Sequence, residues 1–220
     1  MHNGIVVAVA LSIVGFGAEN VNYDKARQGQ LPSGWSAPSG RRWEVRSDKT
    51  APSHPNVLQG GSGNSGSPDQ DVPPLALFDK VLCRDADVTV KFKIASGQAG
   101  QHGNAAGVVW RYHDPNNYYL LTLSADDRNI VLHRVRDGIA EAIAPVGGKR
   151  SGAGVAEDIR AGQWHVVKVS FRGPKVQVYF GNRSLFTAED SGNLTEGKTG
   201  LWAKGANGAA FDDFRIDKKS

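Results

Sequence analysis

Side chains able to hold a sugar recur along the second half of the chain. Aromatic rings pack against the apolar face of a sugar ring, while Arg, Lys and His donate hydrogen bonds to its hydroxyl groups. This mixture is supplied by Arg111, Trp110, Tyr112, Tyr118, His133, Lys168, Trp202 and Lys204. The sequence therefore predicts a carbohydrate-binding surface built from some of these residues.

Strand alternation divides these candidates between two faces. Alternation puts Arg111 on one face with Val109, and Trp110 on the other with Tyr112, so only one set can line a binding surface. Arg111 is either a forked donor to sugar oxygens or a solvated or cross-strand charge. Core packing is the preferred interpretation for Trp110 and Trp202. His133 and Lys168 either contact the ligand or face solvent on an outer sheet.

Three carboxylates form a candidate metal site. Asp212 and Asp213 lie in the last predicted strand, and Asp24 lies in an N-terminal arm expected to run beside it. Oxygen ligands of this kind suit a hard cation such as calcium, so a structural calcium ion is one interpretation. The preferred alternative is that one of the Asp residues pairs with Arg215 or caps a turn.

Motifs for hydrolysis are missing from the sequence. A retaining glycosidase needs two carboxylates about 5 Å apart, but no Glu is followed by a second Glu five residues later. The Gly63–Gly66 stretch lacks the Lys of a phosphate loop, and serine-hydrolase and zinc-hydrolase signatures are absent. We rank a binding or interaction module first, a glycoside-processing enzyme second and a structural domain of the cell envelope third.

The elements that must position these residues are β-strands. Alternation is plain at 87–94, where Val88, Val90, Phe92 and Ile94 share one face. Further strands are predicted at 106–112, 118–124, 130–136, 164–172, 175–180, 184–188, 199–203 and 210–217. Gly181-Asn182 separates two of these runs and is typical of a tight hairpin. Short connections between strands favour an all-β, two-sheet antiparallel jelly-roll sandwich.

The N-terminal part of the chain is expected to be organised differently. The apolar run Ile5–Phe16 is too short to span a bilayer and predicts a signal peptide over residues 1–18 and an exported protein. The alternative is a buried first strand. Residues 19–40 form a predicted arm anchored by Trp35, and residues 41–220 form the sandwich domain. Gly60–Pro74, rich in Gly, Ser and Pro, is predicted to be a long loop.

Composition excludes several partners. The net charge of +4 is spread over scattered Lys and Arg pairs instead of one stripe, so nucleic acid is not an expected partner. No membrane span is expected once the leader is removed. A single cysteine, Cys83, predicts a half-buried free thiol and no disulfide framework. The oligomeric state is left open.

An ordered set of short motifs runs from Asn22 to the C-terminus. These are Leu31-Pro-x-Gly-Trp35, Trp43-Glu-Val45, Asp87-Val-Thr-Val90, Ala106-Gly-Val-Val-Trp-Arg-Tyr112, Asn117-Tyr-Tyr119, Gly162-Gln-Trp-His165, Val176-x-Val-Tyr179, Gly200-Leu-Trp202 and Phe211-Asp-Asp-Phe214. Together they resemble the concanavalin A-like domains. The closest group is the bacterial 3-keto-disaccharide hydrolase domain family, a relative of laminin-G-type and family 16 glycosidase sandwiches.

The resemblance implies a sandwich fold and, from the family name, activity on keto-sugars. That family has Asn-Ser-Gly, an apolar triplet and Arg in the strand that corresponds to Ala105–Arg111, and only Gly107 and Arg111 match. Ala105 and Ala106 replace the Asn and Ser, which removes groups that could hydrogen-bond a substrate. A sandwich of this type hosts binders, glycosidases and lyases alike, so the site residues must decide the function.

Overall fold

The computed structural model describes residues 17–38, 43–61, 74–96, 103–205 and 208–219. Every regular element within these ranges is a β-strand. Across the same ranges, no helix of the length and apolar character needed to cross a membrane is found. Residues 1–16 of the predicted signal peptide and residues 62–73 of the predicted Gly60–Pro74 loop lie outside the described residues.

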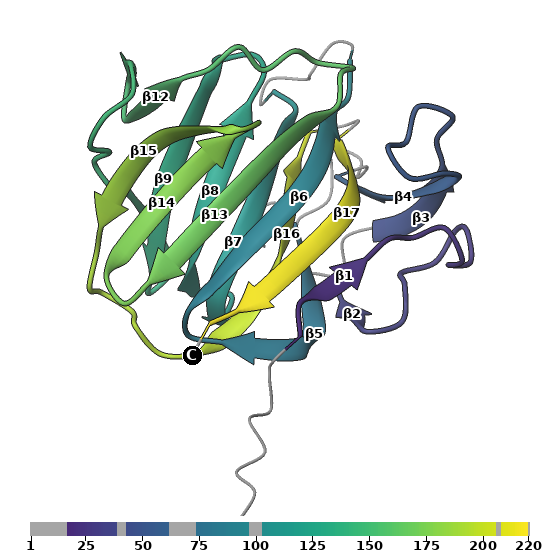
Figure 1. Ribbon diagram of the computed structural model, residues 1–220, viewed down its shortest axis with the longest axis horizontal. Helices are drawn as coiled ribbons and strands as arrows, with labels where there is room; N and C mark the ends of the chain where they lie inside the picture. The colour runs from purple at the N-terminus through teal and green to yellow at the C-terminus, as the bar shows by residue number, and fades with distance from the viewer. Residues whose placement is uncertain (1–16, 39–42, 62–73, 97–102, 206–207, 220) are drawn as a thin grey trace, which may run out of the picture.

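The strands form two antiparallel sheets (Figure 1). One has eight strands, in the order β15-β14-β13-β6-β17-β4-β3 with β1 beside β17; the other has nine, in the order β11-β12-β9-β8-β7-β16-β5-β2 with β10 beside β9. Their bounds are β1 (Glu19–Val21), β2 (Trp35–Ser36), β3 (Trp43–Ser47), β4 (Asn56–Gly60), β5 (Leu75–Cys83), β6 (Ala86–Ile94), β7 (Ala105–Asp114), β8 (Asn117–Ser124), β9 (Asn129–Arg136), β10 (Ile139–Ala142), β11 (Arg150–Ser151), β12 (Gly154–Ala156), β13 (His165–Arg172), β14 (Lys175–Phe180), β15 (Arg183–Glu189), β16 (Gly197–Lys204) and β17 (Ala209–Lys218). The predicted all-β sandwich is confirmed.

The hydrophobic core lies between the two sheets. In β6, buried Val88, Val90, Phe92 and Ile94 alternate with partly exposed residues, which is the pattern the sequence predicts. From the facing sheet, the Trp110 ring stacks on Phe171 at 5.7 Å between ring centroids. Aromatic stacking across the layers therefore fixes how the sheets face one another.

Most predicted strands are present within one or two residues of their expected bounds. The predicted hairpin forms between β14 and β15, and Gly181 at its tip has φ +57°, a left-handed conformation that favours glycine. Strands β3, β4 and β5 were not predicted, because their buried residues run consecutively instead of alternating. Strands covered on both faces lack the two-residue period on which the prediction depends.

The arm is packed against the sandwich. Trp35 is buried, and its ring lies 5.3 Å from Phe78 and 5.0 Å from Phe214 between centroids. Strand β1 pairs with β17 through Val21 and Phe214, and Figure 1 shows the two strands side by side. Both the anchoring of the arm by Trp35 and its course beside the last strand are confirmed.

Candidate functional site

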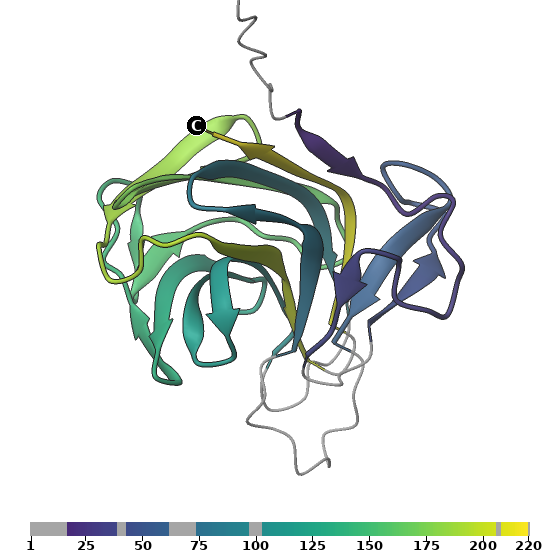
Figure 2. The same cartoon turned by 90° about the horizontal axis from the view of Figure 1, so that it is seen from below.

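The outer face of the nine-stranded sheet is unusually apolar. Figure 2 shows both sheets bent in the same sense, with the nine-stranded sheet on the inside of the bend. A second cluster of buried residues lies on this sheet, separate from the core, and Trp202 packs against it: Leu75, Leu77, Val109, Tyr112, Tyr118, Leu120 and Val135. Outward faces of antiparallel sheets are normally polar. The seven cluster residues have exposures of only 0–8 %, so the half-buried Trp202 is the aromatic residue of this face that is most accessible to a ligand. We call this surface the inner-bend face.

Trp202 approaches the backbone of the inner-bend face closely because the neighbouring strand has a glycine. Trp202 on β16 pairs with Gly107 on β7. A Cβ atom at Gly107 would lie 3.1 Å from Cε3 of Trp202 and 2.8 Å from the backbone oxygen of Leu121. Only a residue without a side chain lets the indole approach this closely. The half-buried indole therefore lies against the strand at Gly107, with part of its surface exposed to solvent.

Two tyrosines lie farther along the same face, where Tyr112 pairs with Lys198 of β16. Tyr112 on β7 and Tyr118 on β8 have ring centroids 5.7 Å apart. Burial raises the pKa of both phenols, that of Tyr118 to about 12. Both hydroxyl groups therefore remain protonated at neutral pH and can donate hydrogen bonds.

Polar groups accompany these aromatic residues. His133 pairs with Leu120 across β8 and β9, and its Nε2 lies 3.2 Å from the hydroxyl oxygen of Thr122, on the next row of the face. Burial lowers the pKa of His133, so the imidazole is neutral at neutral pH and can either donate or accept a hydrogen bond. Lys204 is exposed at the end of β16 beyond Trp202. The face thus joins aromatic platforms to hydrogen-bonding groups and a cation.

Arg111 lies elsewhere, which corrects the predicted alternation of β7. The register between β7 and β8 shifts between Trp110 and Asp114, and Arg111 has φ +48°. This bulge returns Tyr112 to the face of Val109 and turns Arg111 away from it, the reverse of what simple alternation predicts. A bulge depends on the partner strand, so the two-residue period of the sequence contained no sign of it.

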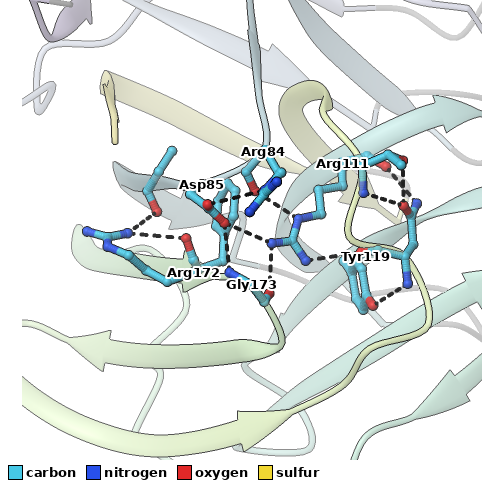
Figure 3. A network of polar contacts seen from close by, with 10 residues as sticks. Arg84, Asp85, Arg111, Tyr119, Arg172 and Gly173 are labelled. Atoms are coloured by element: carbon cyan, nitrogen blue, oxygen red, sulfur yellow. Dashed lines mark hydrogen bonds and ion pairs between the residues drawn. The ribbon is translucent and has the colours of Figure 1, made fainter. Parts of the chain in front are cut away.

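Arg111 is a buried structural residue with an exposure of 1 %. Its guanidinium donates hydrogen bonds to the backbone oxygens of Arg84 (2.9 Å), Asn193 (3.0 Å) and Gly173 (2.8 Å), and to Oδ1 of Asp85 (3.3 Å). Figure 3 shows this network joining separate segments around the guanidinium. These contacts direct its donors into the protein, and we place Arg111 outside the candidate site.

Two further sequence candidates also lie away from the inner-bend face. Trp110 is fully buried in the core, where its ring stacks on Tyr119 at 5.6 Å between centroids. Lys168 is on β13 in the opposite sheet, with Nζ 3.9 Å from the centroid of the Tyr179 ring. The candidates brought together are Tyr112, Tyr118, His133, Trp202 and Lys204. Thr122 was missed, and Gly107 was named only as a match to the family's strand, because the roles of both residues depend on cross-strand register.

The three candidate metal ligands have other partners. Buried Asp212 accepts hydrogen bonds from the backbone nitrogen of Ser53 at 2.8 Å and from its hydroxyl at 3.1 Å, and that hydroxyl lies 3.5 Å from Oδ1 of Asp24. Asp213 forms an ion pair with Lys91 at 2.7 Å. Among the described residues, no group of three or more His, Cys, Asp or Glu side chains is placed to hold a metal ion. Asp212 caps the turn at Ser53, as the alternative interpretation proposed.

Cys83 is more enclosed than the sequence predicts. The residue has an exposure of 0 % instead of being half-buried, and it is a free thiol. Burial raises the pKa of the thiol to about 11, so it is protonated at neutral pH. Cys83 therefore behaves as a small apolar core residue.

Comparisons with known proteins identify the fold. No family model matches the chain, and no curated protein matches it. Among solved structures, the carbohydrate binding module CBM66 from Bacillus subtilis matches with TM-score 0.61 and 18% identity, over 83% of this chain and 94% of that one. A prokaryotic beta-1,3-1,4-glucanase from a mouse hindgut metagenome matches with TM-score 0.58 and 11% identity, over 91% and 98%. The exoplasmic/lumenal domain of VIP36, in its Ca2+/Man-bound form, matches with TM-score 0.54 and 12% identity, over 90% and 88%.

These likenesses cover nearly the whole described sandwich at identities that speak for the fold alone. The matching structures are concanavalin A-like sandwiches, and this chain likewise forms two antiparallel sheets. The chain therefore has the concanavalin A-like jelly-roll fold.

Proposed function

We propose that the chain is a carbohydrate-binding module that holds a sugar on the inner-bend face. The observation that carries the proposal is the half-buried indole of Trp202, which packs against Gly107 on the same face as Tyr112 and Tyr118. A flat aromatic surface stacks on the apolar face of a sugar ring. His133, Thr122 and Lys204 lie around it and supply hydrogen bonds to hydroxyl groups.

Similar structures support the choice of ligand class. One is described as a carbohydrate binding module and another was solved with mannose bound, both on this fold. Export from the cell, predicted from the apolar run Ile5–Phe16, would place the module where polymeric carbohydrate occurs. N-terminal sequencing of the protein purified from its native host tests that part of the proposal.

The test compares two tryptophans on opposite sheets. A broad glycan array identifies ligands, and titration calorimetry then compares wild type with Trp202→Ala. We expect Trp202→Ala to bind at least about tenfold more weakly, equivalent to about 1.4 kcal/mol. Trp164→Ala is the matched control, because Trp164 is also half-buried but lies against Lys93 on the other sheet, where Lys93 Nζ is 5.0 Å from its ring centroid.

Three results would contradict the proposal. Equal affinities of wild type and Trp202→Ala would remove the inner-bend face as the site. Release of product from 3-keto-glucosides or β-glucans would assign catalysis in place of binding. An array with no bound glycan and no turnover would favour a structural domain.

A further inference from the structure

A pocket lies between the arm and the edge of the sandwich. It has a volume of about 890 Å³ and is formed by the arm from Glu19 to Ser33 together with residues of β5, β6, β13 and β17. Its base is apolar, with Phe78 and Phe214 at exposures of 1 % and 0 %. Pockets that hold small ligands have volumes of this order. We call it the arm pocket.

The walls of the arm pocket are strongly basic. Five cations line it against two carboxylates, Glu19 and Asp213. These cations are Lys25, Arg27, Lys80, Lys91 and Arg215. The whole chain has a formal charge of only +4, so much of its positive excess is concentrated here. Charge of one sign gathered in a concave site raises the local concentration of oppositely charged ligand.

Three of these cations are not neutralised. In the described part of the chain, no ion pair or hydrogen bond involves the side-chain nitrogens of Lys25, Arg27 or Lys80. Lys91 is paired with Asp213 at 2.7 Å, and Arg215 donates to the neutral Asn20 at 3.0 Å. The stem of Lys80 lies against Gly34, where an added Cβ would be 2.6 Å from Cε of the lysine. An anionic ligand would therefore meet free positive charge.

The remaining polar residues of the pocket indicate what the anion is attached to. Asn20, Asn22, Gln30, Ser33 and Thr89 contribute amide and hydroxyl groups to the lining. Such groups donate hydrogen bonds to alcohol groups and accept hydrogen bonds from them, and a simple inorganic anion has no alcohol groups. Amides and hydroxyls beside free cations, over a small apolar base, match a sugar that carries a carboxylate.

We propose that the arm pocket binds the uronic-acid units of an acidic polysaccharide. This site is separate from the inner-bend face: the pocket is walled by the arm, by β6, β13 and β17 of the eight-stranded sheet and by Phe78 and Lys80 of β5, and its lining does not include Trp202. A module with both sites would contact a neutral and a charged part of one polymer. The second site does not depend on the first.

The test uses the full chain and charged sugars with neutral counterparts. Trimers of galacturonate, glucuronate and mannuronate are titrated as free acids and as methyl esters, which keep the hydroxyls and lose the charge. We expect at least one acid to bind, its ester to bind at least about tenfold more weakly, and the affinity for the acid to fall with added salt. Lys25→Glu/Arg27→Glu should weaken binding of the acid at least about tenfold.

Control variants separate a local effect from a change in overall charge. Lys149→Glu/Lys175→Glu changes the net charge equally at exposed residues remote from the pocket, and should leave the affinity within about twofold. Asp213→Asn should tighten binding, because it releases Lys91 from its ion pair and removes a carboxylate. Asn tolerates the positive φ of +48° at this position.

The proposal is overturned if no uronate trimer binds, if acid and ester bind alike, or if the two double variants weaken binding equally. Displacement by inorganic sulfate at the same molar concentration as the trimer would assign a general anion site and also overturn it. Trp202→Ala separates the two proposals. Loss of uronate binding in that variant would place the acidic sugar on the inner-bend face, whereas its retention supports the arm pocket.

Discussion

Replacing Arg111 by Ala tests whether this residue stabilises the fold or binds ligand. The guanidinium donates four hydrogen bonds, three of them to the backbone oxygens of Arg84, Asn193 and Gly173. The fourth joins it to Asp85 at 3.3 Å. Its substitution removes the guanidinium donor from the three backbone oxygens, whereas Asp85 still accepts a hydrogen bond from the backbone nitrogen of Gly173 at 2.8 Å. It also opens a cavity between Tyr119 and Phe171, whose ring centroids lie 5.9 and 5.4 Å from the guanidinium carbon.

The expected loss of unfolding free energy follows from these contacts. A hydrogen bond to a charged group contributes about 1.5–3 kcal/mol, and breaking a buried ion pair costs about 3–5 kcal/mol. Asp85 keeps some solvent contact, with a side-chain exposure of 18%, and water can enter the cavity. We therefore expect Arg111→Ala to lower the free energy of unfolding by about 3–5 kcal/mol, and Tm by about 10 °C for a chain of this size.

A second substitution separates the side chain from the backbone. Arg111 has φ +48°, which costs a residue with a Cβ about 1–2 kcal/mol. Arg111→Gly removes the same contacts but tolerates this conformation, so it should be more stable than Arg111→Ala by about 1 kcal/mol. Arg136→Ala, at an exposed arginine of β9, is the control and should change stability by less than about 0.5 kcal/mol.

Urea unfolding followed by circular dichroism measures these differences from the midpoint and slope of the transition. Affinity for the glycan is measured separately at a temperature where each variant is folded, and should be unchanged. A loss below about 1 kcal/mol in Arg111→Ala would refute the structural role. Loss of glycan affinity at unchanged stability would show that Arg111 contributes to ligand binding.

Three further predictions concern the sites. Gly107→Ala should destabilise the fold by about 1–3 kcal/mol and change the near-ultraviolet dichroism of Trp202, because the new Cβ would lie 2.8 Å from the oxygen of Leu121; unchanged spectra and stability would contradict the seating of the indole. Burial lowers the pKa of His133, so the unfolded chain binds a proton more readily and stability should fall as pH drops below about 6.5. Thermal melts of wild type and His133→Gln at pH 5 and 7.5 check this, and an equal acid loss in both would show that other groups cause it. A chelator should leave Tm unchanged, because Lys91 and Ser53 occupy Asp213 and Asp212; a fall that calcium reverses would assign a cation near Asp24.

Local pattern alone predicted the fold class and most strands of the second half. Strands such as β6 have one face in the core and one toward solvent, so apolar residues occur at every second position. In β6 these residues are Val88, Val90, Phe92 and Ile94. The Gly181-Asn182 turn was also predictable, because a tight hairpin turn requires a positive φ that few residues other than glycine and asparagine adopt. The sequence also supplied five of the residues that the inner-bend face brings together.

Tertiary structure decided which of those residues share a surface. Arg111 and Lys168 carry the chemistry of a sugar ligand, but a bulge turns the first into the protein and the sheet order puts the second on the far side. Gly107 seats Trp202 only because β16 pairs with β7 in one register. The arm pocket joins Lys25 to Lys80 and Arg215 from three distant segments. Register, bulges and strand order are set by contacts between segments remote in sequence, so a single-strand period cannot encode them.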